Sequence, residues 1–306
     1  MPTAADVAWF KGQFQQAIAP ALAGTPFSVD MITAVACQET GCIWSVLRRK
    51  GLSTERILQL CVGDSIDASA TGGRRAFPKN KAELLASPEG ARMFALARQG
   101  LVDMAGFVPG YGGAAARPDK FCRGFGIFQL DLQFFRSEPA YFLEQRYADF
   151  GHALQRCIAE LRAALKRIGW AGKTSLSDHE MAAVAIAYNT GRYNPAKGLK
   201  QGHFDGSKHY GENFFSFLQL AHSVQVPVAA PVPATRSRRR EVAVESLAAG
   251  TLARKSVPKK SVTREAVARK ATPGKAIPKK PVPKKAVGVK AAARKPAGRT
   301  ARAISA

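Results

Sequence analysis

Residues 177–191 read Ser-Asp-His-Glu-Met-Ala-Ala-Val-Ala-Ile-Ala-Tyr-Asn-Thr-Gly and carry signals for both ends of an α-helix. Ser177 and Glu180 have the spacing of a capping box, in which each side chain accepts a hydrogen bond from the backbone N–H of the other residue. Gly191 follows the apolar run, where many helices end in a left-handed turn. This stretch therefore predicts a helix with well-defined ends.

Apolar side chains recur at helical spacing through most of the first 222 residues. Asp149 stands where it can cap one such helix, and Ser87 followed by Pro88 predicts the start of another. Residues 124–131 differ, because two glycines precede a short aromatic and aliphatic run that favours a hairpin or an extended loop. The predicted fold class is mainly α, with a small β element.

The composition changes abruptly after about Ser223. From Arg236 onward the chain has 21 basic and 3 acidic residues, and no Phe, Trp or Tyr follows Phe217. Such a segment has little to bury, so it cannot offset the entropy lost on ordering. We therefore expect one domain in residues 1–222 and a disordered Lys/Pro/Ala-rich basic tail in residues 223–306.

The basic residues 236–306 admit three interpretations. Their Lys-Lys pairs can neutralise the phosphates of nucleic acid, as in the linker-histone tails that these repeats resemble. They can instead hold the protein on anionic polymers of the cell wall or on lipid headgroups. The third interpretation is a solubilising extension with no dedicated partner.

The sequence argues against several other classes of protein. No stretch approaches the ~20 apolar residues of a transmembrane helix, and the N-terminus lacks the pattern of a secretion signal. The five cysteines are too few for a disulfide scaffold and fit no zinc spacing, and His179-Glu180 is not followed by a second histidine ligand. We expect no metal and no cofactor. Disulfide pairing, localisation and oligomeric state stay open.

Glu39 is the first candidate for chemistry, because it shares a helical face with the apolar residues Ile32, Val35 and Ala36. Gly41 predicts that this helix ends directly after Glu39, where the helix dipole disfavours an anion. Burial and the dipole would both raise the pKa of the carboxyl group, as a general acid working near neutral pH requires. The alternative is a side chain that turns into solvent or pairs with an arginine.

Two other groups of residues are candidates for binding. Tyr188 and Asn189, at the end of the predicted helix, can stack on a hydroxyl-rich ligand and hydrogen-bond to it. In the glycine-led loop, Phe128 can form the floor of a cleft, Gln129 can bind substrate, and Asp131 supplies a second carboxylate. Taken singly, each group is more typical of a packed core, a helix cap or a turn than of a binding site.

Three motifs in chain order resemble those of the lysozyme-like superfamily, specifically goose-type lysozymes and the related lytic transglycosylases. They are Gln38-Glu39-Thr40-Gly41, Gly126-Ile-Phe-Gln-Leu-Asp131 and Ala187-Tyr-Asn-Thr-Gly191. At the corresponding places the family has a catalytic Glu followed by Ser, then Gly-Leu-Met-Gln, then Ala-Tyr-Asn-Ala-Gly. The resemblance covers about residues 25–222 and implies a lysozyme-like fold. It also implies cleavage of the β-1,4 bond between N-acetylmuramic acid and N-acetylglucosamine in peptidoglycan.

The resemblance assigns a role to residues of all three motifs: Glu39 as general acid, Gln129 and Asn189 as hydrogen-bonding groups, Tyr188 as the tyrosine beside the Glu, and Asp131 as the carboxylate that places water. Asp119 is a candidate counterpart of a further goose-type aspartate. About ninety residues separate Glu39 from Gln129. This spacing exceeds that of the family, so residues 45–120 are expected to be an inserted segment.

Two products are compatible with such an enzyme. If Glu39 activates the 6-hydroxyl of the sugar itself, the product has a 1,6-anhydro end and the enzyme is a lytic transglycosylase. If Asp131 holds a water on the opposite face of the ring, the enzyme is an inverting lysozyme. The alternatives to an enzyme are a catalytically inactive glycan-binding protein and a polyanion- or DNA-binding protein that acts through its tail.

Overall fold

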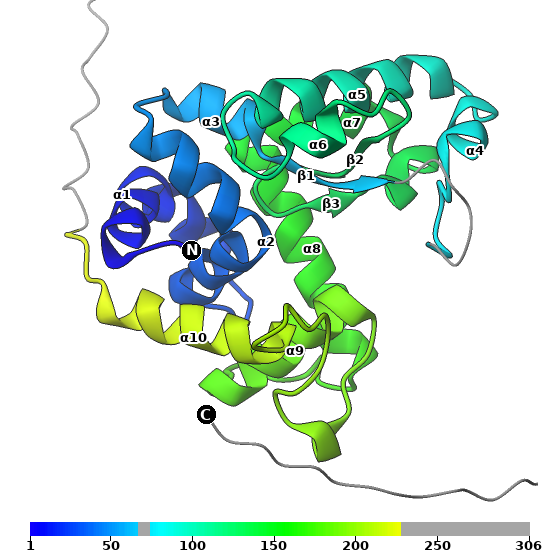
Figure 1. Ribbon diagram of the computed structural model, residues 1–306. Coiled ribbons are helices and arrows are strands. Elements are labelled where there is room, and N and C mark those ends of the chain that lie inside the picture. Colours follow the sequence, from blue (N-terminus) through cyan, green and yellow to red (C-terminus); the bar gives the residue numbers. More distant parts are fainter. Residues whose placement is uncertain (67–73, 228–306) are drawn as a thin grey trace, which may run out of the picture. The chain divides into compact units, whose positions relative to one another are not determined.

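The computed structural model describes residues 1–66 and 74–227, and it confirms a mainly helical protein (Figure 1). The helices of this described part are α1 (Ala4–Ala21), α2 (Val29–Arg49), α3 (Thr54–Leu60), α4 (Lys81–Leu85), α5 (Gly90–Ala105), α6 (Gly112–Ala115), α7 (Pro139–Leu143), α8 (Phe150–Arg167), α9 (Asp178–Thr190) and α10 (Tyr210–Ser223). Three short 3-10 segments are η1 (Leu132–Arg136), η2 (Arg146–Ala148) and η3 (Pro195–Lys197).

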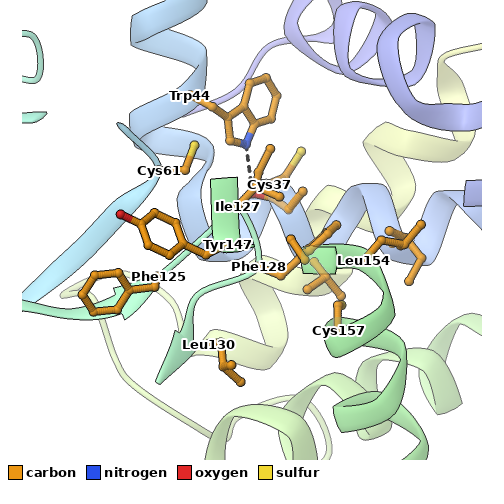
Figure 2. Packing of buried hydrophobic residues seen from close by; sticks show 14 of the residues in the cluster. Cys37, Trp44, Cys61, Phe125, Ile127, Phe128, Leu130, Tyr147, Leu154 and Cys157 are labelled. Atoms are coloured by element: carbon orange, nitrogen blue, oxygen red, sulfur yellow. Dashed lines mark hydrogen bonds between the residues drawn. The ribbon is translucent and has the colours of Figure 1, made fainter. Parts of the chain in front are cut away.

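The long helix α2 packs against α1, α3 and α10. Ser28 caps its start by accepting the backbone N–H of Met31. Trp44 on this helix is fully buried, stacks on Trp9 with ring centroids 5.7 Å apart, and donates a 3.0 Å hydrogen bond to the carbonyl of Ala36 (Figure 2). The tryptophan thus joins α1 and α2 without leaving its indole N–H unsatisfied.

The small β element predicted around residues 124–131 is a three-stranded antiparallel sheet. Its order is β1 (Val62–Ile66), β2 (Phe121–Phe125) and β3 (Leu130–Asp131), with Gly124 opposite both Gly63 and Asp131. The tight turn between β2 and β3 requires a left-handed backbone at Gly126, where φ is +81°. Helix α5 covers β1 and β2 (Figure 1).

The segment expected to be an insertion, residues 45–120, is part of this same framework. It begins inside α2, which continues to Arg49, and it supplies α3, β1, α4, α5 and α6. Because β1 pairs along β2, the segment builds one edge of the sheet.

The predicted helix ends are largely confirmed. Asp149 caps α8 by accepting the N–H of His152. Ser177 forms the predicted capping box at the start of α9, which ends at Gly191 with φ +77°. The predicted start at Ser87 is wrong. The Ser87 hydroxyl instead donates to a carbonyl of α4, and α5 begins at Gly90.

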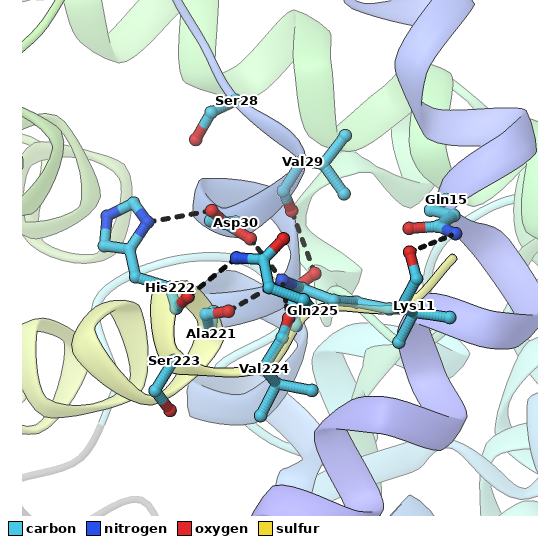
Figure 3. A network of polar contacts seen from close by, with 12 residues as sticks. Lys11, Gln15, Ser28, Val29, Asp30, Ala221, His222, Ser223, Val224 and Gln225 are labelled. Atoms are coloured by element: carbon cyan, nitrogen blue, oxygen red, sulfur yellow. Dashed lines mark hydrogen bonds and ion pairs between the residues drawn. The ribbon is translucent and has the colours of Figure 1, made fainter. Parts of the chain in front are cut away.

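A polar network fastens the end of α10 to α1 and α2 (Figure 3). The buried Lys11 ammonium donates to the carbonyls of Ala221 and Val224, at 2.6 and 2.7 Å, and forms a 2.5 Å ion pair with Asp30. His222 lies between the carboxylates of Asp30 and Asp178. Lys11 thus binds carbonyls at the end of the helix, where a cation is favoured.

All five cysteines are free thiols. Among the described residues, no helix is long and apolar enough to cross a membrane, and no three His, Cys, Asp or Glu side chains are grouped as metal ligands. The predicted start of the disordered tail at residue 223 is wrong, because Ser223 is the last residue of α10 and Val224 is buried and bound by Lys11. The rest of the predicted tail, from residue 228, and the prediction of an anionic partner for residues 236–306 lie outside the described residues.

Candidate active site

A cleft of about 550 Å³ opens between the sheet, α2, α8 and α9. The residues that line it are Glu39, Asp64, Arg74, Arg123, Gly124, Gln129, Leu130, Asp131, Gln133, Phe134, Glu160, Arg167, Tyr188, Asn189, Thr190 and Gly191. All three sequence motifs contribute to this wall, although about 150 residues of chain separate the first motif from the last.

Two hydrogen bonds from motif residues hold the β2–β3 hairpin in place. The Thr40 hydroxyl on α2 donates to the carbonyl of Ile127 at 2.5 Å. The Tyr188 hydroxyl on α9 donates to the next carbonyl, that of Phe128, at 2.8 Å. The turn of the hairpin is therefore fixed to the two helices that carry Glu39 and Asn189.

Glu39 lies in the interior of α2 rather than at its end. The prediction that Gly41 terminates this helix is wrong, because α2 continues to Arg49 and Gly41 is packed closely against Pro2. A residue without a side chain is needed there for that contact, not for a left-handed turn. The helix dipole therefore does not act on Glu39 as the sequence suggested, since its effect is confined to the terminal turns.

Burial is nevertheless sufficient to perturb the Glu39 carboxyl group. It raises the pKa of Glu39 from 4.5 to about 7, chiefly through loss of solvation. A 2.7 Å hydrogen bond from the Tyr210 hydroxyl opposes this pKa rise, and the negative charge of Asp64 adds to it. A carboxyl group with such a pKa can both donate and accept a proton near neutral pH.

The other carboxylates that line the cleft are each ion-paired with an arginine. Asp64 pairs with Arg123 at 2.6 Å, and Glu160 pairs with Arg156 at 3.0 Å. Asp131 pairs with Arg74. Among the described residues of the cleft wall, Glu39 is the one acid held by a neutral hydroxyl instead.

Asp131 lines the cleft, and both of its carboxylate oxygens accept hydrogen bonds from the protein. Arg74 donates to both of them and also to the carbonyl of Phe77. Asp131 in addition accepts the backbone N–H of Gln133 at 2.7 Å, which caps η1. The carboxylate is thus a structural link between the sheet edge and the chain after residue 73.

Gln129 also lines the cleft, but its amide is turned toward the hairpin. Its Nε2 donates to the carbonyl of Gly126 at 2.9 Å and to that of Cys61 at 3.4 Å. The side chain lies so close to Gly63 and Gly124 that a Cβ atom at Gly124 would collide with it. These glycines are therefore required by the position of Gln129.

Asn189 is exposed at the end of α9 and lines the cleft. Phe128 does not form the cleft floor. Its ring is buried in the core (Figure 2). The ring centroid lies 5.9 Å from that of Phe150, and only the Phe128 carbonyl contributes to the site, by accepting from Tyr188. The sequence spacing could not show whether Phe128 faces the cleft or the core, because successive side chains of a hairpin alternate between its two faces.

Asp119 does not line the cleft, and it pairs with Lys81 at 2.8 Å. The proposed counterpart of a further catalytic aspartate is therefore misplaced. Two acids of the cleft carried no signal in the sequence: Asp64, which pairs with Arg123, and Glu160, which pairs with Arg156. Asp64 comes from β1, and nothing in the local sequence indicated that this strand would pair beside the hairpin.

Comparisons of the chain with protein-family models, with curated proteins and with solved structures gave no significant match.

Proposed function

We propose that this protein is a glycosidase that cleaves the β-1,4 bond between N-acetylmuramic acid and N-acetylglucosamine in peptidoglycan. The observation that carries the proposal is the state of Glu39. It is the cleft carboxyl that lacks an ion pair among the described residues, and its pKa is about 7. The resemblance of the three motifs to lysozyme-like enzymes supports the choice of substrate.

In the first step, protonated Glu39 donates its proton to the glycosidic oxygen as the bond from that oxygen to the anomeric carbon breaks. Positive charge develops on the sugar ring, and the leaving sugar departs with a neutral hydroxyl group. Tyr210 stabilises the carboxylate that remains, because its hydroxyl donates to Oε1 of Glu39.

In the second step, we propose that ionised Glu39 accepts the proton of the 6-hydroxyl of muramic acid while that oxygen bonds to the anomeric carbon. The product is a 1,6-anhydro end, and no water is consumed. Inverting hydrolysis would instead need a second carboxylate as base to activate a water on the opposite face of the ring. Asp64, Asp131 and Glu160 are each paired with an arginine, which favours the non-hydrolytic outcome.

The test is release of soluble fragments from purified bacterial sacculi by the full-length protein. Glu39→Gln keeps the shape of the side chain and removes the transferable proton, so the rate should fall ~10² to 10⁴-fold. Glu144→Gln is the matched control, because Glu144 is exposed and pairs with Arg146 outside the cleft. A folded Glu39→Gln protein that retains activity within about tenfold of the wild type would contradict the assignment.

Sacculi also test the main alternative, a glycan-binding protein without turnover. Co-sedimentation with sacculi but no release of fragments by the wild-type protein would support binding and overturn the enzymatic proposal.

A further inference from the structure

The arginines of the cleft wall are not equivalent. Arg74 and Arg123 are neutralised by Asp131 and Asp64, so neither offers a free charge. Arg167 also lines the cleft, and no acidic side chain within residues 1–66 and 74–227 pairs with it. Arg167 is an exposed residue. The cleft therefore carries one positive charge that no acidic side chain of the described residues neutralises.

Arg167 is nevertheless held in a defined position. It is the last residue of α8, and its Nη1 donates a 3.1 Å hydrogen bond to the carbonyl of Ala187 on α9. The cleft wall continues from there through Asn189 to Gly191. A guanidinium group has five N–H donors in a planar fork, so one bond leaves most of them for a ligand. A carboxylate is the ligand that this fork fits best.

We propose that Arg167 binds a carboxylate of the glycan substrate and so selects an anionic strand over a neutral one. The inference rests on the proposed function. N-acetylmuramic acid carries a lactyl group whose carboxyl is either free or joined to a stem peptide with further carboxylates, whereas N-acetylglucosamine carries neither. Both sources present the same chemistry to Arg167.

A purely structural role for Arg167 makes a different prediction. The carbonyl of Ala187 also accepts the N–H of Gly191, so Arg167 can be regarded as a group that closes the end of α9. In that case its removal would lower stability and affect every glycan equally. A ligand role affects only glycans that carry carboxylates.

The experiment measures binding by the full-length Glu39→Gln protein, whose expected slow turnover leaves the strands intact during the measurement. The ligands are strands stripped of their peptides, with free lactyl carboxylates; the same strands after conversion of those groups to methylamides; strands that retain stem peptides; and oligomers of N-acetylglucosamine. High ionic strength screens the long-range attraction of other basic residues. Arg167→Gln is compared with Arg162→Gln, an exposed arginine of the same helix that does not line the cleft.

Loss of one charge-assisted hydrogen bond at a partly exposed site should weaken binding about tenfold. We expect this loss for Arg167→Gln with carboxylate-bearing strands, and little change with methylamide strands or neutral oligomers. A loss confined to peptide-bearing strands assigns the carboxylate to the stem peptide, and a loss with stripped strands assigns it to the lactyl group. Equal affinities of Arg167→Gln and Arg162→Gln, or equal losses on methylamide strands, would overturn the proposal.

Failure of carboxylate binding by Arg167 and failure of glycan cleavage by Glu39 give different results in these experiments. Because binding is measured without turnover, carboxylate-dependent binding through Arg167 can stand even if sacculi are not cleaved. Conversely, Glu39-dependent cleavage with no carboxylate preference would overturn the role of Arg167 alone.

Discussion

The Tyr210 hydroxyl donates a 2.7 Å hydrogen bond to Oε1 of Glu39, across 171 positions of sequence. Tyr210 is the first residue of α10, and Glu39 lies in the interior of α2. These two helices pack together, so the bond is made at a helix interface rather than within a mobile loop. It ties the candidate acid to the last helix of the described domain.

The pH dependence of activity should report this bond. A general acid must be protonated, so kcat/KM should fall as pH rises through about 7, the pKa of Glu39. Tyr210→Phe removes a donor that stabilises the ionised form and lowers the pKa. The falling limb should therefore move to higher pH by about one unit. Tyr193→Phe, outside the cleft wall, should leave the limb unchanged. An unshifted limb in Tyr210→Phe would contradict the account.

Glu39 should also lower the stability of the native protein at neutral pH. Below pH 4.5 the carboxyl is protonated in both the folded and the unfolded states. As pH rises from 4.5 to about 7, the unfolded state releases the proton while the folded state retains it, so stability is lost. The loss reaches on the order of 3 kcal/mol above the folded-state pKa.

Glu39→Gln does not titrate and should escape this loss. In urea unfolding it should be more stable than the wild type at pH 8, and the difference should shrink toward pH 4. A constant difference between the two proteins over this range would show that the pKa of Glu39 is not raised by folding.

Gly124→Ala tests the close approach of the sheet to Gln129. The added methyl group would collide with the Gln129 side chain and displace its bonds to the carbonyls of Gly126 and Cys61. We expect a loss of ~1 to 3 kcal/mol in stability, with reduced cleavage of sacculi. Gly12→Ala on α1, where a Cβ atom meets open space, is the control and should be neutral or slightly stabilising. Equal stabilities of the two variants would be inconsistent with this packing.

Lys11→Met tests the network at the other end of α10. The change removes the buried ammonium group from the carbonyls of Ala221 and Val224 and from Asp30, which keeps only its contact with His222 among these polar partners. We expect a loss of about 3 kcal/mol in the free energy of unfolding. Lys50→Met removes an exposed lysine and should change stability little. A free energy of unfolding of Lys11→Met within about 0.5 kcal/mol of the wild-type value would show that this network contributes little to stability.

Local signals in the sequence predicted the parts of the fold that depend on neighbouring residues. Asp149, Ser177 and Gly191 act at helix ends as their types and positions indicated. The glycine-led run of residues 124–131 predicted the β2–β3 hairpin. Helix caps and tight turns are set within a few residues, which is why a single sequence contains them.

Contacts between distant segments were not predictable in the same way. Gly41 was predicted to end the helix, because the sequence does not show that Pro2 packs against it. Asp64 lines the cleft because β1 pairs with β2, and no local pattern in the sequence encodes this long-range pairing. For the same reason, the ion pairs that distinguish Asp131 from Glu39 became visible only in the structure.

The central claim is that Glu39 acts first as acid and then as base on the glycan strand. Mass spectrometry of the fragments released from bacterial sacculi tests it most directly, with the wild-type protein and Glu39→Gln incubated in parallel. The account predicts 1,6-anhydro muropeptides from the wild type and almost none from Glu39→Gln. Reducing ends as the main product would contradict the second step, and undiminished release by Glu39→Gln would contradict the claim as a whole.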